Sequence, residues 1–338
     1  MDERTKKHQI EILKILKDAE KPMGSVRIVE ELAAAGVEMK DRTVRFHLRR
    51  MDELGLTHKV SRRTGRTITP LGAEELEHAN VIRRISFIVS KIEGLSYNMT
   101  FGISKKAGTV VLNVSYVPLD RLTEALGEIE LAFRAGLGMG RLVLLKGPGE
   151  KVGRSTVPED MVGIGTVCSV TLNGALLKAG VPVVSRYGCL LRIENGEPAG
   201  FTELVDYLGA SLDPLELFLR AGMTSVGRAA RGGSGLVGAS FREVPAAVGR
   251  ALGSIEGKLR AVGLGGVLAV GKPNQPLLNV PVNEGMIGVV VVGGINPIAA
   301  AHEIGIRTEN IALHSLVDYG ELYDFEKLRS EIRRLSLS

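Results

Sequence analysis

The stretch DRTVRFHLRRMDELGLTHKVSRRTGRTITP, residues 41–70, carries one helical pattern followed by two short strand patterns. Val44, Leu48 and Met51 recur at helical spacing and form one apolar stripe, and Gly55 marks the end of that helix. The residues that follow predict a strand, a turn at a Thr-Gly pair and a second strand that stops at a proline. The stretch is therefore expected to fold as a helix and a two-stranded hairpin.

Two further helical patterns precede this stretch. TKKHQIEILKILKDAEK (residues 5–21) repeats isoleucine and leucine along one helical face. GSVRIVEELAAAGVE (residues 24–38) has the features of a short helix, with Ser25 as a candidate N-cap and Gly36 as its end. Three helices followed by a two-stranded hairpin predict a winged helix-turn-helix domain, which we place at residues 1–72.

Positive charge is concentrated in the first part of the chain. The net charge of the whole sequence is +5. Residues 1–85 hold 18 Lys and Arg against 14 Asp and Glu, a net of +4, and residues 40–66 hold nine against three. Such a patch is a candidate footprint for nucleic acid, although a solvated charged face gives the same composition. The helix-turn-helix pattern at the same residues favours DNA binding.

The third helix is expected to read DNA. At about 100° per residue, its apolar stripe faces the core and leaves its arginines on the other side. The N-terminal part of such a helix enters the major groove, and positions further along it hold phosphates. The predicted DNA contacts are Arg42, Thr43, Arg45 and Phe46 at base edges, Arg49 and Arg50 at phosphates, and Arg62, Arg63 and Arg66 at the backbone or minor groove. For Phe46 the alternative is packing against the hairpin, and a winged helix can also serve as a protein-interaction module.

The overall composition is that of a globular protein. Hydrophobic residues are 44% and charged residues 24%, while aromatic residues are only 4% with no Trp, which argues against a base-stacking platform. The two cysteines, Cys168 and Cys189, cannot form a disulfide framework. The N-terminus does not have the pattern of a signal peptide, and the longest apolar run is too short to span a bilayer, so a cytoplasmic protein is expected.

The motifs of common enzyme chemistry do not fit the sequence. GPGEKVGRST (147–156) lacks the spacing of a phosphate loop, and GLGMG (136–140) follows a helix rather than a strand. The histidines are scattered, and neither cysteine has a partner at metal-ligand spacing. Cys168 with His302 or His314 could form a nucleophile and base, but a small buried cysteine is the simpler interpretation. We therefore expect no metal, no cofactor and no catalytic residue.

The rest of the chain repeats itself. A connecting helix closed by a glycine is predicted over residues 73–94. Beyond it, the blocks ALGEIE and ALGSIE, two Val-Pro segments that lead to an Asn, and LVDY at Leu204 and Leu316 occur twice in the same order. The repeat predicts an α/β effector body built from two repeated α/β units, residues 95–226 and 227–338, with GRAARGGSG as the linker between them. Chance similarity of amphipathic segments is the alternative, and the two LVDY blocks are interpreted as equivalent strand ends.

The strand ends before the two matched asparagines are the candidate ligand site. CSVTLNG (168–174) and VVGGINP (291–297) bring small residues and an Asn from a strand into a helix. Free amides at such a junction suit anions, so a small carboxylate ligand is expected there. The candidate effector-binding residues are Thr166, Cys168, Asn173, Gly174, Arg186, Gly293, Gly294 and Asn296. The alternative is that Asn173 and Asn296 only cap their helices.

Four motifs together resemble one known family. They are DRTVRFHLRRMDELG of the winged helix, GTVCSVTLNG from Gly165, SLDPLE from Ser211 and VVVGGINPIAA from Val290. The chain resembles the archaeal nitrogen regulatory repressor family, NrpR, over essentially its whole length. The resemblance implies one winged helix and one effector domain, the latter with an internal repeat.

The resemblance also implies a function and its partners. Members of the family are transcriptional repressors of nitrogen-fixation and ammonia-assimilation genes, bind palindromic operators as oligomers, and are released by 2-oxoglutarate. A homodimer or higher homo-oligomer on double-stranded operator DNA, with 2-oxoglutarate as its effector, is therefore the expectation. A dicarboxylate effector agrees with the anion site expected from the two loops. The rival interpretations are a winged-helix regulator of another metabolite and an enzyme-like α/β body fused to a DNA-binding domain.

Overall fold

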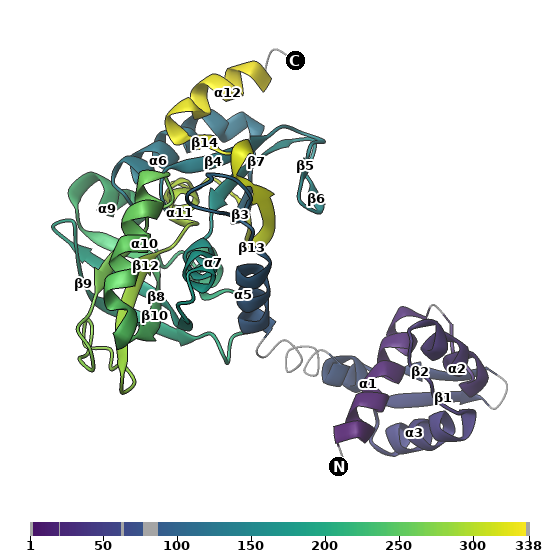
Figure 1. The fold of residues 1–338 in the computed structure, drawn as a ribbon. Coiled ribbons are helices and arrows are strands. Elements are labelled where there is room, and N and C mark those ends of the chain that lie inside the picture. Colours follow the sequence, from purple (N-terminus) through teal and green to yellow (C-terminus); the bar gives the residue numbers. More distant parts are fainter. Residues whose placement is uncertain (1–2, 20, 62–63, 77–86, 336–338) are drawn as a thin grey trace. The chain divides into compact units, whose positions relative to one another are not determined.

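The computed structural model describes residues 3–19, 21–61, 64–76 and 87–335 of the chain (Figure 1). The chain divides into two compact units, Met1–Ile85 and Ser86–Ser338, and each is built around hydrophobic cores of its own. Within the described ranges, the helices are too short or too polar to cross a membrane.

The N-terminal unit is a winged helix-turn-helix domain, as the sequence predicts. Its elements are α1 (Glu3–Asp18), α2 (Ser25–Ala34), α3 (Asp41–Glu53), β1 (Thr57–Ser61) and β2 (Gly65–Ile68). The apolar stripes of the three helices meet in one core, and β1 pairs antiparallel with β2 to form the wing. The N-cap of α2 is Gly24 rather than the predicted Ser25, whose hydroxyl instead accepts a hydrogen bond from Arg45.

The C-terminal unit contains two five-stranded sheets, and the first has the strand order β13-β3-β7-β4-β14. Its strands are β3 (Thr109–Pro118), β4 (Leu142–Lys146), β7 (Met161–Val167), β13 (Glu309–Asp318) and β14 (Tyr323–Asp324). Helices α5 (Phe87–Asn98), α6 (Leu122–Arg134) and α7 (Val170–Lys178) come from the same half of the sequence as β3, and β5 (Lys151–Val152) with β6 (Ser155–Thr156) forms a small separate hairpin. All pairings in the first sheet are antiparallel.

The second sheet has the strand order β11-β12-β10-β8-β9, again with antiparallel pairings. Its strands are β8 (Val184–Glu194), β9 (Glu197–Asp206), β10 (Gly235–Pro245), β11 (Val267–Val270) and β12 (Met286–Val292). The remaining helices are α8 (Pro214–Arg220), α9 (Val226–Gly232), α10 (Gly249–Ala261), α11 (Asn296–Glu303) and α12 (Leu328–Leu335).

The two halves of this unit exchange their last strands. Each half runs strand, helix, strand, strand, helix, which is the beginning of a ferredoxin-like unit whose fourth strand pairs with its first. Here the fourth strand of each half crosses over: β8 pairs with β10, and β13 pairs with β3. Neither predicted half, 95–226 or 227–338, therefore contains a complete sheet, and the predicted α/β body is a single interlocked structure.

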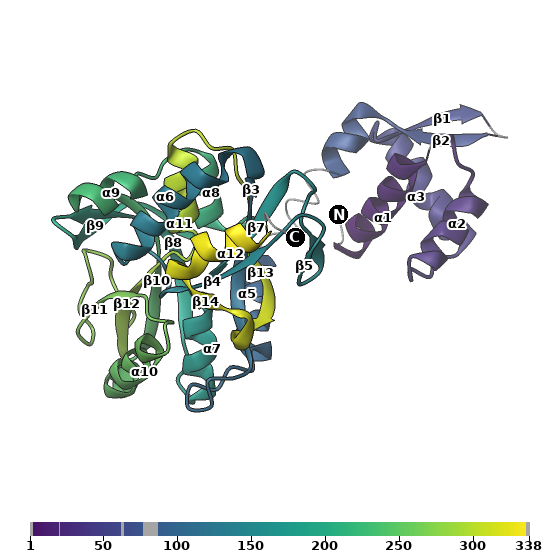
Figure 2. The ribbon, with the colours of Figure 1, turned by 90° about the horizontal axis from the view of Figure 1, so that it is seen from above.

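Helices cover the strands from two sides. Figure 2 shows α7 and α10 on one side and α6, α9 and α11 on the other. One hydrophobic core lies with each group of helices, and both cores take side chains from both sheets. The first core includes Leu112 and Val289, and the second includes Ile164 and Phe241. This arrangement ties the two halves together through their interiors.

Two segments differ from the sequence-based expectation. GRAARGGSG, predicted as a linker, forms most of α9, because Val226 and Ala229 are buried and fix it as a helix. The helix that the sequence closes at Gly94 continues to Asn98 as α5, and the middle of the predicted connecting helix 73–94 lies outside the described residues.

The two LVDY blocks do not occupy equivalent positions. The first ends β9, the outer strand of the β8–β9 hairpin, whereas the second ends β13, which follows α11 directly. Each aspartate does have a structural role at a strand end, as predicted. Asp206 accepts a hydrogen bond from the amide of Leu208, and Asp318 accepts one from the amide of Gly320.

Candidate DNA-binding surface and effector cavity

Helix α3 presents a basic surface. Val44, His47, Leu48 and Met51 are buried, which leaves the arginines of the helix exposed. The predicted contacts on this helix are placed as follows: Arg42, Arg45, Phe46, Arg49 and Arg50 are exposed, and Thr43 is half-buried. Phe46 is 62% exposed, so it does not pack against the wing. An exposed aromatic ring among arginines is suited to contact with a thymine methyl group.

The four arginines of α3 differ in whether they form ion pairs. Arg45 forms an ion pair with Asp41 and donates to Ser25, and Arg50 lies 3.6 Å from Glu53. Among the described residues, Arg42 and Arg49 have no ion pair. These two guanidinium groups are therefore the most available for phosphates or guanine bases.

The described part of the wing exposes less positive charge for DNA than the sequence predicts. Arg66 is turned inward, because its Nε lies 2.8 Å from the Asp52 carboxylate at the end of α3. Asp52 also accepts a hydrogen bond from the Thr57 hydroxyl, so this cluster fixes the wing to the helix. This corrects the predicted role of Arg66 in reaching DNA. Arg62 and Arg63 lie outside the described residues.

A small cavity, which we call the inner cavity, lies in the C-terminal unit where the two halves meet. Its volume is about 20 Å³, enough for little more than one water molecule. It is lined by Ile92, Asn113, Cys168, Ser169, Val170, Ser185, Tyr207, Asp213, Leu215, Arg242, Gly294, Ile295, Ala312 and Leu313. These residues come from both halves of the repeat, so the exchange of strands builds the cavity.

Arg242 of β10 is the most unusual group in the inner cavity. Its side chain is 2% exposed, and its two terminal nitrogens donate to the carbonyl and the hydroxyl of Ser169, at 2.9 and 2.8 Å. Its Nε has no partner, and none of the carboxylates that the structure describes forms an ion pair with it. Burial lowers the pKa of Arg242 to about 10, so the group still carries its charge at neutral pH. A buried cation without a counter-ion favours an anionic ligand.

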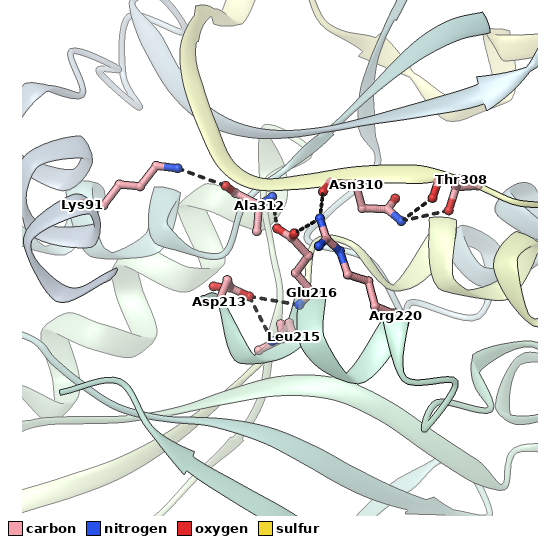
Figure 3. Close-up of polar contacts among 8 residues, drawn as sticks. All are labelled: Lys91, Asp213, Leu215, Glu216, Arg220, Thr308, Asn310 and Ala312. Carbon is pink, nitrogen blue, oxygen red and sulfur yellow. Dashed lines mark hydrogen bonds and ion pairs between the residues drawn. The ribbon is translucent and has the colours of Figure 1, made fainter. Parts of the chain in front are cut away.

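Asp213 also lines the inner cavity. It caps α8 by accepting hydrogen bonds from the amides of Leu215 and Glu216 (Figure 3). Burial nevertheless raises the pKa of the Asp213 carboxyl to about 6, because the charged form loses its hydration. The cavity therefore combines a fixed positive charge with a carboxyl group that is easily neutralised.

Asp213→Asn is expected to stabilise the protein at pH values above about 6. A raised pKa means that the Asp213 carboxyl favours the folded state below its unfolded pKa and loses this contribution as the pH rises through about 6. The shift from 3.8 to about 6 corresponds to about 3 kcal/mol. Asparagine can still cap α8, so the variant should gain up to this amount over the wild type between pH 4 and 8. Urea unfolding followed by circular dichroism measures the gain.

The matched control for this variant is Asp206→Asn. Asp206 is an exposed carboxylate that accepts a similar turn hydrogen bond at a strand end. A pH-dependent gain of the same size at Asp206, or a gain at Asp213 that does not change with pH, would contradict the explanation by burial.

A larger pocket, which we call the outer pocket, adjoins the inner cavity. Its volume is about 460 Å³, and it shares Ile92 and Ser185 with the inner cavity. It is lined by Val89, Ile92, Glu93, Ser96, Tyr97, Asn173, Leu177, Pro182, Val183, Val184, Ser185, Arg186, Asp206 and Leu208. Ile92 and Ser185 thus border both spaces.

The predicted effector-binding residues are divided between these spaces. Cys168 and Gly294 line the inner cavity, and Asn173 and Arg186 line the outer pocket. The other four predicted residues line neither space: Thr166, Gly174, Gly293 and Asn296. Four of the eight predicted residues thus line one of the two spaces, and their role in binding an effector stays a prediction.

The four remaining residues are buried in the interior of the unit. A Cβ on Gly174 would lie 2.7 Å from Met99, and one on Gly293 would lie 2.6 Å from Leu215. Asn296 exchanges two hydrogen bonds with the backbone of Gly238, each 2.9 Å long. The Thr166 hydroxyl is buried without a partner inside the first sheet.

The simpler alternatives for two predicted groups are also resolved. Neither Asn173 nor Asn296 caps its helix, because the N-cap positions are Ser169 and Ile295. Burial raises the pKa of the Cys168 thiol to about 12, so Cys168 is a neutral buried thiol rather than a nucleophile.

Sequence reasoning missed the central residues of the inner cavity. Arg242, Ser169 and Asp213 were not among the predicted site residues, although each lines the cavity. A signal for Arg242 was present, since GASFREVP puts two adjacent charges into an otherwise apolar strand. Glu243, the other charge, pairs with Arg186 and accepts from Asn283. Only the structure shows that Arg242 is left without such a partner.

The fold and these two sites define a class, the winged-helix transcription regulators with an α/β regulatory body. Residues 10–76 match the family model described as the ribonuclease R winged-helix domain. Residues 85–324 match the model described as NrpR regulatory domains NRD1 and 2. The chain belongs to the NrpR family.

Named relatives support the same conclusion. The chain is 37% identical over 319 residues to the global nitrogen regulator NrpRI of Methanosarcina mazei, which covers 94% of this chain and 98% of the relative. It is 33% identical over 313 residues to the global nitrogen regulator NrpR of Methanococcus maripaludis, covering 93% of this chain but only 54% of that relative. The chain therefore spans about half the length of the second relative and nearly all of the first.

A solved structure shares the fold. The crystal structure of a nitrogen repressor-like protein from Methanococcus jannaschii matches with a TM-score of 0.59 and 29% sequence identity, over 70% of this chain and 98% of that one. Together with the winged helix, these likenesses make the chain a transcriptional regulator of nitrogen genes, and the relatives are named as regulators rather than as enzymes.

Proposed function

We propose that the protein is a repressor of nitrogen-fixation and ammonia-assimilation genes that binds operator DNA as a homodimer and is released by 2-oxoglutarate. The observation that carries the proposal is the buried guanidinium of Arg242, which has no carboxylate partner in the described structure. A dicarboxylate supplies the missing negative charge. DNA is bound through α3, whose exposed arginines lie on one helical face.

The effector is proposed to bind with one carboxylate on Arg242. The Nε of Arg242 is an unpartnered donor, and the Ser169 hydroxyl, whose oxygen accepts from Arg242, can donate its own proton to the same carboxylate. The inner cavity is too small for a five-carbon diacid at about 20 Å³, so binding requires the wall at Ile92 and Ser185 to open toward the outer pocket. A ligand that binds only the opened state shifts the protein toward that state.

Each chain is proposed to hold one effector site, because the repeat does not copy the charge. Counting back from the Val-Pro pairs that end β3 and β10, the position of Arg242 is taken by Ser115 in the other half. Counting back from the matched asparagines, the position of Ser169 is taken by Val292. A serine and a valine cannot replace the cation and its hydroxyl neighbour, so the pseudo-symmetric position does not bind an anion.

The neutral form of Asp213 is expected to assist the effector. An anion beside Arg242 shares a small cavity with this carboxyl group, so its charged form opposes binding. Effector binding is therefore coupled to uptake of a proton by Asp213 and weakens as the pH rises above about 6.

The proposal is tested by operator binding in the presence of the effector. A palindromic duplex selected from random DNA by the protein itself is labelled, and fluorescence anisotropy follows its release as 2-oxoglutarate is added at constant ionic strength. Release by 2-oxoglutarate and not by equal sodium chloride is the expected result. Operator binding that does not change at millimolar 2-oxoglutarate would contradict the proposal that 2-oxoglutarate is the effector. A selection that enriches no sequence would contradict the proposal that the protein binds a specific operator.

A further inference from the structure

Strand β13 contains a bulge whose residues are not paired with the neighbouring strand of the sheet. The pairing of β13 with β3 is interrupted between Ile311 and Ser315, so the bulge residues 312–314 stand opposite the single Asn113. Leu313 within the bulge has φ of 54°, a left-handed conformation that is uncommon for a leucine. Such a segment keeps its shape only if groups outside the ladder fix it.

Side chains from three other elements hold the backbone of the bulge, and Ser155 of β6 is hydrogen-bonded to the ring of His314. The amide of Ala312 donates to Glu216 of α8 at 2.9 Å, and the amide of Leu313 donates to Asn113 of β3 at 3.1 Å. The ammonium group of Lys91 on α5 donates to the carbonyl of Ala312 at 3.4 Å. Figure 3 shows Lys91 and Glu216 meeting Ala312 from opposite sides.

Glu216 is itself held in place. Its carboxylate pairs with Arg220 one turn further along α8, and Arg220 also donates to the carbonyl of Asn310, just before the bulge (Figure 3). The contact from α8 is therefore braced at two points. The contact from α5 combines the longer hydrogen bond of Lys91 with apolar side chains, since Ile88 and Ile92 lie in the same hydrophobic core as Ala312 and Leu313.

The bulge is also a wall of the inner cavity. Ala312, Leu313 and Asn113 line it together with Arg242. Because the cavity holds about 20 Å³, a carboxylate ligand on Arg242 must displace some of the lining, which includes this bulge as well as Ile92 and Ser185. The bulge can move without breaking a strand ladder, since its backbone is not paired with β3.

Helix α5 connects this wall to the rest of the protein. It carries Lys91, and the next residue, Ile92, lines both the inner cavity and the outer pocket. In the chain, α5 (Phe87–Asn98) is the first described element after the winged-helix unit, so the covalent path from the effector body to the DNA-binding domain starts with it.

We propose that Lys91 is the residue that couples occupancy of the inner cavity to DNA binding, by holding α5 to the bulge of β13. Filling the cavity displaces the bulge, the Lys91–Ala312 hydrogen bond breaks, and α5 takes a second position. Lys91 acts through α5 and not on the ligand. This inference rests on the proposed function, because it requires that an effector binding at Arg242 releases DNA.

Lys91→Met tests the coupling. Methionine keeps the apolar stem of the lysine against the body and removes only the donor. Effector binding is measured by calorimetry with and without saturating operator DNA. Coupling is reciprocal, so in the wild type the operator should weaken effector binding by the same factor by which the effector weakens operator binding, about 10-fold or more. In Lys91→Met both factors should fall below about 3-fold, while effector affinity in the absence of DNA should not fall and should rise slightly, because no hydrogen bond then has to break.

The controls separate the possible results. Lys258→Met removes an exposed lysine from α10 and should keep full coupling. Lys91→Arg keeps a donor at residue 91 and should also show the coupling that Lys91→Met loses. Full coupling in Lys91→Met overturns the inference and leaves the proposed function standing. Loss of effector affinity with unchanged coupling identifies Lys91 as a ligand contact and also overturns it. Absence of coupling in the wild type overturns the proposed function itself.

Discussion

Arg242→Met is expected to abolish release of DNA by 2-oxoglutarate while operator binding stays intact. The guanidinium is the buried cation that the effector carboxylate is proposed to meet, and truncation of one partner of such a pair costs about 2–5 kcal/mol. Effector affinity should therefore fall by about 30-fold or more, since 1.4 kcal/mol corresponds to a factor of ten. Calorimetry measures this fall directly, and anisotropy shows whether the operator is still bound.

The variant is expected to fold. Replacing a buried charge by an apolar side chain of similar length is often neutral or stabilising, and only the contacts with Ser169 are lost. The matched control is Arg192→Met, which removes an exposed arginine from β8 in the same sheet. Wild-type affinity for 2-oxoglutarate in folded Arg242→Met would place the effector elsewhere, and the outer pocket would be the next site to examine.

The parts of the structure that local pattern controls could be predicted. In α3 the apolar stripe of Val44, Leu48 and Met51 defines the buried face. The Asn195-Gly196 pair forms the turn between β8 and β9, with both residues at positive φ as that turn requires. These features depend on neighbours in the sequence, so the sequence is sufficient to find them.

The inner cavity could not be found in the same way. Arg242 and Ser169 are 73 residues apart, and they meet only because the halves exchange strands. The repeated LVDY blocks suggested two separate units, whereas the pairing of β8 with β10 interlocks them. Arg66 shows the same limit on a smaller scale, since nothing near it in the sequence indicates that Asp52 will bind its guanidinium. Contacts between residues far apart in the sequence therefore determine which charged groups form ion pairs and which are left to bind ligands.

The difference between paired and unpaired arginines also indicates which substitution in α3 should weaken operator binding most. Arg42→Ala combined with Arg49→Ala removes the two α3 guanidinium groups that have no ion pair among the described residues, whereas Arg45 is already held by Asp41. Each such contact is worth about 1–3 kcal/mol, so the double variant should lose about 30-fold or more in operator affinity.

Salt and effector titrations show whether that loss comes from the DNA interface. If both arginines neutralise phosphates, the slope of log affinity against log salt should fall by about two per protomer, because fewer counter-ions are released. The control is Arg228→Ala with Arg333→Ala, which removes the same charge from exposed positions of the effector body. It should keep the operator affinity, and both double variants should bind 2-oxoglutarate as the wild type does. Equal losses of operator affinity in the two double variants would mean that net charge, and not the surface of α3, holds the DNA.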